Sequence, residues 1–373
     1  MKLLYTIPAT YRPAGMERVL ANKANWFAAR GYELVIVTTD QRGRASAFAF
    51  DPSIRMIDLG IGYEDNNGGS FASKILRYPG KQLRHRIRLS HVLKAEKADI
   101  VISMFGNDAA FVPRIKDGSR KVLEIHFSRF KRLQYGRRGL WALADRFRSW
   151  NDKRVASRFD SFVVLTNEDR GYWGDMPNIR VIPNARTFEP LPYCSKSGRE
   201  RHTVLAVGRL NVQKGFGRLI DVWAGCARGG WTLRIVGDGE LRVELQDRAE
   251  RLGIADSVTI GPSDRSMVEE YADADIYAMT SLYEGLPMVL LEAQAAGLPI
   301  VSVPCKCGPR DVITDGVDGY ICELPDFPSR LRGLMDDEEL RGRMGRAALT
   351  ASERFAEDRI MAMWTELFEE LTR

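Results

Sequence analysis

Short apolar runs alternate with longer amphipathic stretches through the first half of the chain. The runs are apolar nearly throughout, which is the pattern of strands buried on both faces of a parallel sheet. They occupy residues 3–7, 34–38, 100–104, 122–125 and 162–165. After the first run, a loop of proline and glycine leads into a predicted helix over residues 17–30, and Gly31 suits the position just beyond its end. The alternation predicts a doubly wound α/β domain.

The same pattern starts again in the second half, after a connector rich in proline and polar residues. Apolar runs recur at residues 204–207, 233–236, 257–260, 276–279 and 300–303. The restart predicts a second Rossmann-like domain, so we expect an N-terminal domain over 1–186 and a C-terminal domain over 187–352. An amphipathic terminal helix over 353–373 is expected to pack back on the first domain. Ligands of such sheets bind beyond the carboxyl ends of the strands, and two facing sheets predict a cleft between the domains.

Two glutamates eight positions apart carry the most informative chemical signal. Glu284 lies in a loop with a glycine and a proline, and Glu292 lies about one turn inside an apolar segment, 288–296, that predicts a helix. The N-terminus of this helix offers unpaired N–H groups and partial positive charge, which suit a phosphate. Two carboxylates beside it suit diols. A nucleotide-sugar carries both groups, so the spacing favours that ligand.

Charge divides unevenly between the two halves. Residues 1–180 contain 32 Lys and Arg against 18 Asp and Glu, a net charge of +14, whereas residues 181–373 carry −8. The basic residues gather in two stretches, 74–97 and 129–154, with apolar side chains interleaved. Such surfaces favour anionic lipid headgroups or phosphate-bearing partners, although each stretch alone could be a solvated helix face. Because no recognition motif for nucleic acid accompanies the charge, we expect no nucleic-acid partner.

The cysteines indicate neither a disulfide framework nor a metal site. They are odd in number and scattered, at Cys194, Cys226, Cys305, Cys307 and Cys322, which is typical of a reducing cytoplasm. Cys305 and Cys307 have no neighbouring His or Cys cluster to complete a metal site. No stretch approaches the roughly 18 consecutive apolar residues of a membrane-spanning helix. We expect a cytoplasmic protein, peripheral on the inner face of the plasma membrane.

A set of short motifs runs in order along nearly the whole chain. In the second half they are AVGRLNVQKGF at 206–216, IVGDGE at 235–240, the segment 281–299 with the paired glutamates, and CGPRDVITDGVDG at 307–319. In the first half they are AGMER at 14–18, IHF at 125–127, VLTNED at 164–169 and IPN at 182–184. Together they resemble the retaining, nucleotide-sugar-dependent glycosyltransferases of family 4. The resemblance implies the GT-B fold of two facing Rossmann-like domains.

Two cations mark the expected phosphate site. Arg209 and Lys214 follow a predicted strand and stand five positions apart, where a planar guanidinium and a compact ammonium suit a diphosphate. On their own they could be solvated surface residues. The resemblance implies that both neutralise the departing nucleoside diphosphate, and that neither a metal ion nor a cofactor is required.

The resemblance also separates the roles of the two glutamates. Glu292 would accept hydrogen bonds from the ribose diol, and Glu284 would face the transferred sugar. The backbone N–H groups of Gly285 and Leu286 would lie near the sugar hydroxyls and the phosphate. Without the resemblance, Glu284 could be an exposed loop acid and Glu292 an acid that stabilises the helix dipole.

Three further residues are carried over with alternatives open. Gly15, where the first loop turns into a helix, would let the backbone approach the donor phosphates, or it is a simple turn glycine. His126 follows a strand and would contact the donor sugar near the reacting carbon, although a lone histidine there is often structural. Ser263 would lie near the base.

The implied reaction transfers a hexose-type sugar to an acceptor hydroxyl with retention at the anomeric carbon. The departing diphosphate itself would help to take the acceptor proton. The segment CKCGPR at 305–310 resembles a branch that commonly uses UDP-sugars, which favours UDP over GDP. The basic half favours a lipid-linked saccharide acceptor, as in bacterial capsule, exopolysaccharide or O-antigen synthesis. A GT-B nucleotide-sugar epimerase and a catalytically inactive homologue that binds a partner remain as alternatives.

Overall fold

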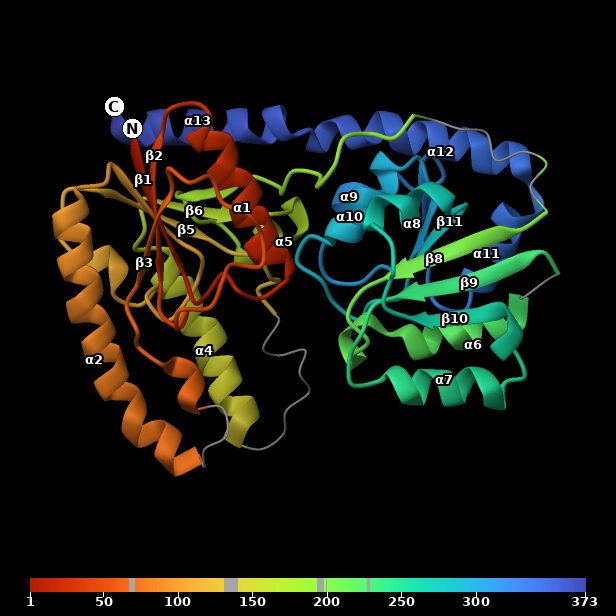
Figure 1. Ribbon diagram of the computed structural model, residues 1–373, viewed down its shortest axis with the longest axis horizontal. Coiled ribbons are helices and arrows are strands. Elements are labelled where there is room, and N and C mark those ends of the chain that lie inside the picture. The colour runs from red at the N-terminus through yellow and green to blue at the C-terminus, as the bar shows by residue number, and fades with distance from the viewer. Residues whose placement is uncertain (67–70, 131–139, 193–197, 199, 227–228) are drawn as a thin grey trace. The chain divides into compact units, whose positions relative to one another are not determined.

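A computed structural model describes residues 1–66, 71–130, 140–192, 198, 200–226 and 229–373. The chain divides into two compact units. Unit 1 comprises Met1–Leu165, Arg170–Ile182 and Ile360–Arg373, and unit 2 comprises Thr166–Asp169 and Pro183–Arg359. Each unit is built on one parallel sheet with helices around it, which confirms the predicted fold class (Figure 1).

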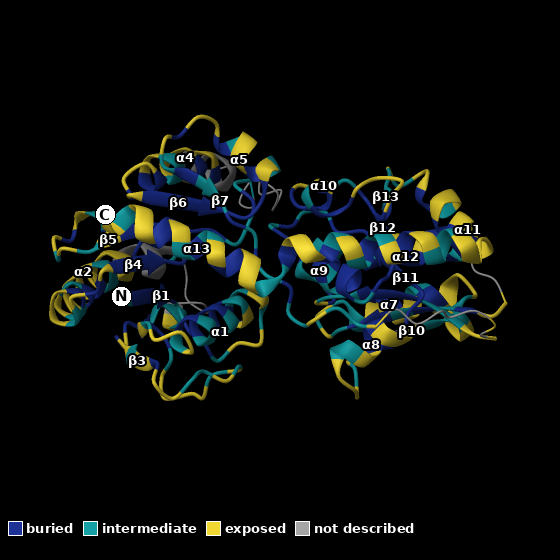
Figure 2. Ribbon diagram, turned by 90° about the horizontal axis from the view of Figure 1, so that it is seen from above, coloured by how far each residue is buried: buried dark blue, intermediate teal, exposed yellow. Residues whose placement is uncertain are grey.

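The sheet of unit 1 has seven strands in the order β3-β2-β1-β4-β5-β6-β7. The strands are β1 Lys2–Ile7, β2 Glu33–Thr38, β3 Arg55–Asp58, β4 Ile100–Ser103, β5 Arg120–Glu124, β6 Ser161–Val164 and β7 Ile179–Val181. The helices are α1 Gly15–Ala28, α2 Phe71–Glu96, α4 Leu140–Ala156 and α5 Asn167–Trp173. The five predicted runs match the five inner strands, which are buried along almost their whole length (Figure 2).

The terminal helix α13, Glu357–Thr372, completes unit 1 from its residue 360 onward. Its apolar face carries Trp364, Leu367 and Phe368, all buried. The ring centroid of Phe368 lies 5.4 Å from that of Phe27 on α1. The terminal helix therefore packs on the first Rossmann-like unit, as the sequence predicts.

The sheet of unit 2 has six strands in the order β10-β9-β8-β11-β12-β13. The strands are β8 His202–Val207, β9 Trp231–Val236, β10 Val258–Gly261, β11 Ile276–Met279, β12 Ile300–Ser302 and β13 Gly319–Ile321. The helices are α6 Phe216–Cys226, α7 Arg242–Arg251, α8 Met267–Asp273, α9 Met288–Ala295, α10 Pro309–Val312, α11 Phe327–Asp336 and α12 Glu338–Ser352. Helix α9 begins at the residue that the sequence predicts.

Apart from the short segment Thr166–Asp169, the chain enters unit 2 at Pro183, a few residues before the expected boundary at 186. Arg186 explains the position, since its backbone N–H donates to the carbonyl of Phe355 at 2.9 Å. Its guanidinium donates to the carbonyl of Ser352 at 3.2 Å and to Glu353 at 3.0 Å. These bonds tie residue 186 to the end of α12 and therefore to unit 2. Among the described residues, no helix combines the length and apolar character needed to cross a membrane.

Candidate active site

Two segments meet at the carboxyl ends of the neighbouring strands β8 and β11. Lys214 ends a short 3-10 helix, and the preceding carbonyl, of Gln213, accepts a hydrogen bond from the N–H of Leu282 at 2.8 Å. Gly215 follows with φ +64°, and a Cβ there would collide with the carbonyl oxygen of Thr280. Only glycine therefore lets the two loops lie this close. The fold brings the predicted phosphate-binding lysine beside the segment of the first glutamate.

Lys214 and Glu284 form an ion pair in this place. The ammonium donates to Oε1 of Glu284 at 2.7 Å, and the side chains are 18% and 9% exposed. The backbone of Glu284 is fixed on both sides: its N–H donates to the carbonyl of Lys306 at 2.7 Å, and its carbonyl accepts from Cys307 at 3.1 Å. The carboxylate is held in place, and solvent reaches the pair.

Arg209 and the start of α9 complete this edge of the sheet. Arg209 is exposed, and in the described part of the chain its guanidinium has no hydrogen bond or ion pair. Helix α9 starts after Pro287, and no side chain caps its first turn. Gly285 and Leu286 immediately precede it. An exposed cation and an uncapped helix start are both features that can receive an anion.

Glu292 lies one turn inside α9 and is half-buried. Its Oε1 accepts a hydrogen bond from the hydroxyl of Thr187, and its Oε2 accepts one from the hydroxyl of Tyr271, both at 2.8 Å. Each carboxylate oxygen has a further lone pair, so both bonds are compatible with a diol as an additional donor. The two hydroxyls fix the orientation of the carboxylate.

His126 lies two residues beyond the end of β5 in unit 1, and its side chain is largely buried. Its Nε2 lies 3.1 Å from Oε1 of Glu124. The two groups are not aligned for a hydrogen bond, and this buried nitrogen bonds to no other described atom. Both oxygens of Glu124 accept from Nζ of Lys23 on α1, at 2.6 Å. The predicted histidine therefore lies against a buried ion pair.

The remaining predicted residues are Gly15 and Ser263. Gly15 is the first residue of α1; Ala14 supplies no side-chain cap, and a Cβ on Gly15 would meet no atom within 4 Å. Packing therefore does not require a glycine there. The hydroxyl of Ser263 donates to Glu270 at 2.7 Å, and Arg265 donates to the same carboxylate at 3.1 Å. Burial opposes the ionisation of Glu270, but the hydrogen bonds from Arg265, Arg234 and Ser263 outweigh it and lower its pKa to about 2.

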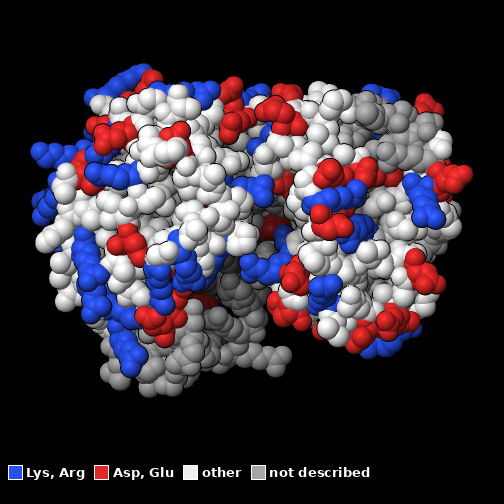
Figure 3. Space-filling model, viewed as in Figure 1, with Lys and Arg blue, Asp and Glu red and all other residues white. Residues whose placement is uncertain are grey.

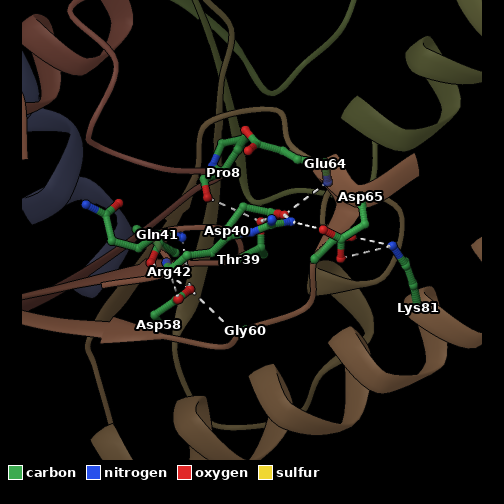
Figure 4. Close-up of polar contacts among 12 residues, drawn as sticks. Pro8, Thr39, Asp40, Gln41, Arg42, Asp58, Gly60, Glu64, Asp65 and Lys81 are labelled. Atoms are coloured by element: carbon green, nitrogen blue, oxygen red, sulfur yellow. Dashed lines mark hydrogen bonds and ion pairs between the residues drawn. The ribbon is translucent and has the colours of Figure 1, made fainter. Parts of the chain in front are cut away.

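A polar network that sequence reasoning did not identify lies at the carboxyl ends of β1–β3 (Figure 4). The buried Asp40 accepts from the N–H of Glu64 at 3.1 Å, and Asp58 accepts from the N–H of Arg42 at 2.9 Å. The hydroxyl of Tyr11 donates to both oxygens of Glu64, at 2.7 and 2.8 Å. Burial opposes the ionisation of Glu64, but the bond from Tyr11 and the nearby arginines lower its pKa. Unit 1 thus presents ordered acids and hydroxyls at this edge.

Sequence reasoning missed four residues that hold the predicted ones: Lys23, Glu124, Thr187 and Tyr271. A local signal existed for Glu124, because a carboxylate inside an apolar strand is costly to bury unless it is paired. No such signal marked Thr187 or Tyr271. Cys305 and Cys307 are buried, and the described residues contain no group of three potential ligands able to hold a metal ion.

Comparison with known proteins accounts for both units. The family model described as Glycosyltransferase Family 4 matches residues 13–186, and the model described as Glycosyl transferases group 1 matches residues 195–350. AmsD, the amylovoran biosynthesis glycosyltransferase of Erwinia amylovora, is 35% identical over 218 residues. This match covers 56% of the present chain and 62% of AmsD, which is less than two thirds of that protein.

Two further similarities extend over nearly the whole chain. An uncharacterized glycosyltransferase of Haemophilus influenzae is 28% identical over 362 residues, covering 94% of this chain and 95% of that protein. The crystal structure of TarM has a TM-score of 0.79 at 15% identity and covers 98% of both chains, which shows a shared GT-B fold. Since the two family models follow one another along both units, the chain belongs to the glycosyltransferases of family 4.

Proposed function

We propose that this glycosyltransferase moves a hexose-type sugar from a nucleoside diphosphate, UDP in preference to GDP, to a saccharide acceptor with retention at the anomeric carbon. One observation carries the proposal. Lys214, Glu284 and the uncapped start of α9 meet at the carboxyl edge of the unit 2 sheet, with Glu292 one turn further along. A cation, two carboxylates and open N–H groups match the phosphates and diols of one donor molecule.

The ion pair suggests how donor binding is organised. A diphosphate that reaches Lys214 replaces Glu284 as the partner of the ammonium, because phosphate oxygens are strong acceptors for it. Glu284 is then released to accept hydrogen bonds from the sugar hydroxyls. Arg209 adds a second cation, and Glu292 holds the ribose. Gly15 leaves the start of α1 open to the donor phosphates, and Ser263 lies toward the base.

During transfer, the bond from the anomeric carbon to the diphosphate oxygen breaks and a bond to the acceptor oxygen forms on the same face. The acceptor proton passes to an oxygen of the departing diphosphate. Lys214, Arg209 and the N–H groups of Gly285 and Leu286 stabilise the growing negative charge, which is the usual role of preorganised donors. His126 contacts the sugar near the reacting carbon. The protein supplies these charges itself, so the step requires no metal ion.

The preference for UDP is supported by structural neighbours. A TarM variant from S. aureus was solved with fondaparinux, α-GlcNAc-glycerol and UDP. HepE of Anabaena, with a TM-score of 0.71 at 18% identity, was solved with UDP and glucose. For the present chain UDP remains a proposal, tested by a thermal-shift panel of UDP, GDP, ADP and dTDP. We expect UDP to raise the melting temperature most, because ligands that bind only the folded state stabilise it.

Product analysis separates transfer from its alternatives. With donor and acceptor present, the transferase forms a glycosylated acceptor and free nucleoside diphosphate. An epimerase would instead release altered free sugar or nucleotide-sugar without an acceptor. An inactive homologue would form no product, and a complete lack of nucleotide-induced stabilisation would contradict the donor site.

We propose that the acceptor is a lipid-linked saccharide of bacterial surface-polysaccharide synthesis and that it binds unit 1. AmsD takes part in amylovoran biosynthesis by its name, and Tyr11 and Glu64 offer polar groups at the carboxyl edge of unit 1. Figure 3 shows Lys and Arg over α2, where Leu83 and Ile87 are 59% and 50% exposed, one helical turn apart. A basic helix with exposed apolar residues suits an anionic membrane surface.

Vesicle flotation tests the membrane part of the proposal. The protein is expected to float with anionic vesicles and to remain with the soluble fraction when the vesicles are zwitterionic. The variant Leu83→Glu with Ile87→Glu should lose flotation, whereas Val243→Glu, an exposed position on α7 of unit 2, should retain it. The basic stretch 129–154 lies partly outside the described residues; within it, Trp150 on α4 is exposed beside Arg154.

A further inference from the structure

An ion pair lies in the core of unit 1, away from solvent. Lys23 on α1 and Glu124 on β5 are each 1% exposed, and Nζ lies 2.6 Å from both carboxylate oxygens. Removing two charges from water costs several kcal/mol for each ion, and apolar replacements of such pairs are often neutral or stabilising. Packing alone therefore does not account for charged residues at these positions.

Three elements enclose the ammonium of Lys23. It lies 3.9 Å from the ring centroid of Trp364 on α13 and 5.3 Å from that of Tyr5 on β1. Aromatic faces attract a cation, and the attraction is larger when water is absent. The ammonium of Lys23 is thus held by the carboxylate of Glu124 and by the aromatic rings of Trp364 and Tyr5. Its position fixes that of Glu124.

Glu124 is the last residue of β5, and His126 lies two positions further along the chain. Nε2 of His126 lies 3.1 Å from Oε1 of Glu124 and is buried, so the two atoms are within hydrogen-bonding distance. Burial opposes the ionisation of Glu124, but the charge and the hydrogen bonds of Lys23 outweigh it and hold its pKa below the usual value of 4.5. The carboxylate is therefore an ionised acceptor beside the imidazole.

We propose that Glu124 is a positioning residue for His126, and that Lys23 holds Glu124 in place for this role. The carboxylate accepts a hydrogen bond from Nε2–H, which fixes the ring orientation and leaves Nδ1 as the unprotonated nitrogen. The inference rests on the proposed function only in taking His126 as a group that contacts the donor sugar. The position of the proton on the ring can be tested without any activity.

The experiment compares double variants in which neither charge is left alone. The amide variant combines Lys23→Met with Glu124→Gln and keeps an oxygen that can accept a hydrogen bond from Nε2–H. The apolar variant combines Lys23→Met with Glu124→Leu and removes that oxygen. The matched control is Lys121→Met with Asp117→Asn, which removes another buried pair that involves β5. Nitrogen-15 NMR of the His126 ring, in the neutral limit of a pH series, reports which nitrogen carries the proton. Initial rates give kcat and KM for the donor.

We expect a single Nε2–H form in the wild type, the amide variant and the control, and a mixture of forms in the apolar variant. The kcat should fall about tenfold or more in the apolar variant, as expected for a misplaced catalytic group, and recover largely in the amide variant. A wild-type ring protonated on Nδ1, or unchanged ring signals in the apolar variant, would overturn the inference. If the apolar variant does not fold, the nitrogen-15 signals of the wild-type His126 ring still test the inference, because they show which nitrogen carries the proton. If the His126 ring carries its proton on Nε2 but the protein shows no transfer activity, the proposed function is contradicted and the inference about Glu124 is not.

Discussion

The two units each contain a short lysine–glutamate pair, and the pairs differ mainly in their access to water. Lys214 and Glu284 lie 2.7 Å apart with 18% and 9% of their side chains exposed, whereas Lys23 and Glu124 lie 2.6 Å apart and are 1% exposed. An accessible pair can exchange its partner for a ligand. A sealed pair cannot, so its charges can act only on neighbouring protein groups. The same chemistry thus suits donor binding in unit 2 and positioning in unit 1.

Breaking one member of each pair should give the largest contrast in stability. Lys23→Met leaves Glu124 buried and unpaired, which should lower the free energy of unfolding by about 3–5 kcal/mol. Lys214→Met leaves a carboxylate that is 9% exposed rather than 1%, so the loss should be smaller. Urea unfolding of both variants measures the difference. Equal losses of unfolding free energy in the two variants would contradict the distinction between a sealed and an accessible ion pair.

The order of Lys23 and Lys214 should be reversed when the variants are compared by activity instead of stability. Lys214→Met removes a charge that stabilises the departing diphosphate, so kcat should fall about a hundredfold to a thousandfold. Arg251→Met, at an exposed cation on α7 of the same unit, serves as the control and should leave kcat unchanged. Steady-state rates with saturating donor test this. A Lys214→Met enzyme with wild-type kcat would exclude the leaving-group role.

The fold was predictable from sequence because strands buried on both faces must be apolar. Nine of the ten predicted runs correspond to inner strands, and the tenth corresponds to the edge strand β10, whose last two residues are buried. The missed strands are short or at a sheet edge: β3 is largely exposed, and β7 and β13 have three residues each. Too few of their positions are buried to create an apolar run.

The candidate site was predictable only where its chemistry is local in sequence. Glu284 and Glu292 share one loop and helix, and Arg209 and Lys214 share one loop. The supporting contacts are not local: Lys23 and Glu124 are 101 positions apart, and Thr187 and Glu292 are 105 apart. No spacing rule connects such residues, because only the folded sheet brings them together.

Donor affinity should respond to the residues around Glu292. Glu292→Ala removes hydrogen bonds of about 1.5–3 kcal/mol to a charged group, so the Kd for the donor nucleotide should rise at least about tenfold. Tyr271→Phe removes one hydroxyl that orients the carboxylate, with an effect of about 1 kcal/mol, roughly a fivefold rise in Kd. Isothermal titration of both variants measures the two changes. A larger effect from Tyr271→Phe would place the ribose elsewhere.

The smallest expected effect is on acid stability. Because the pKa of Glu124 is held below 4.5 in the folded protein, its ionisation stabilises the fold above that pH. This contribution is lost as the pH falls below 4.5 toward the folded-state pKa. The Lys23→Met, Glu124→Gln variant lacks the carboxylate and should lose less stability over the same range. Denaturation midpoints at a series of acidic pH values test this, and identical slopes would contradict it.

The central claim is that Lys214 exchanges Glu284 for a nucleoside diphosphate. Titration calorimetry with UDP, in the presence of a metal chelator, tests it most directly on the wild type, Lys214→Met and Arg251→Met. We expect binding by the wild type and by Arg251→Met, and a Kd at least about tenfold higher for Lys214→Met. Equal affinity of the wild type and Lys214→Met, or no binding of any nucleoside diphosphate by the wild type, would contradict the account.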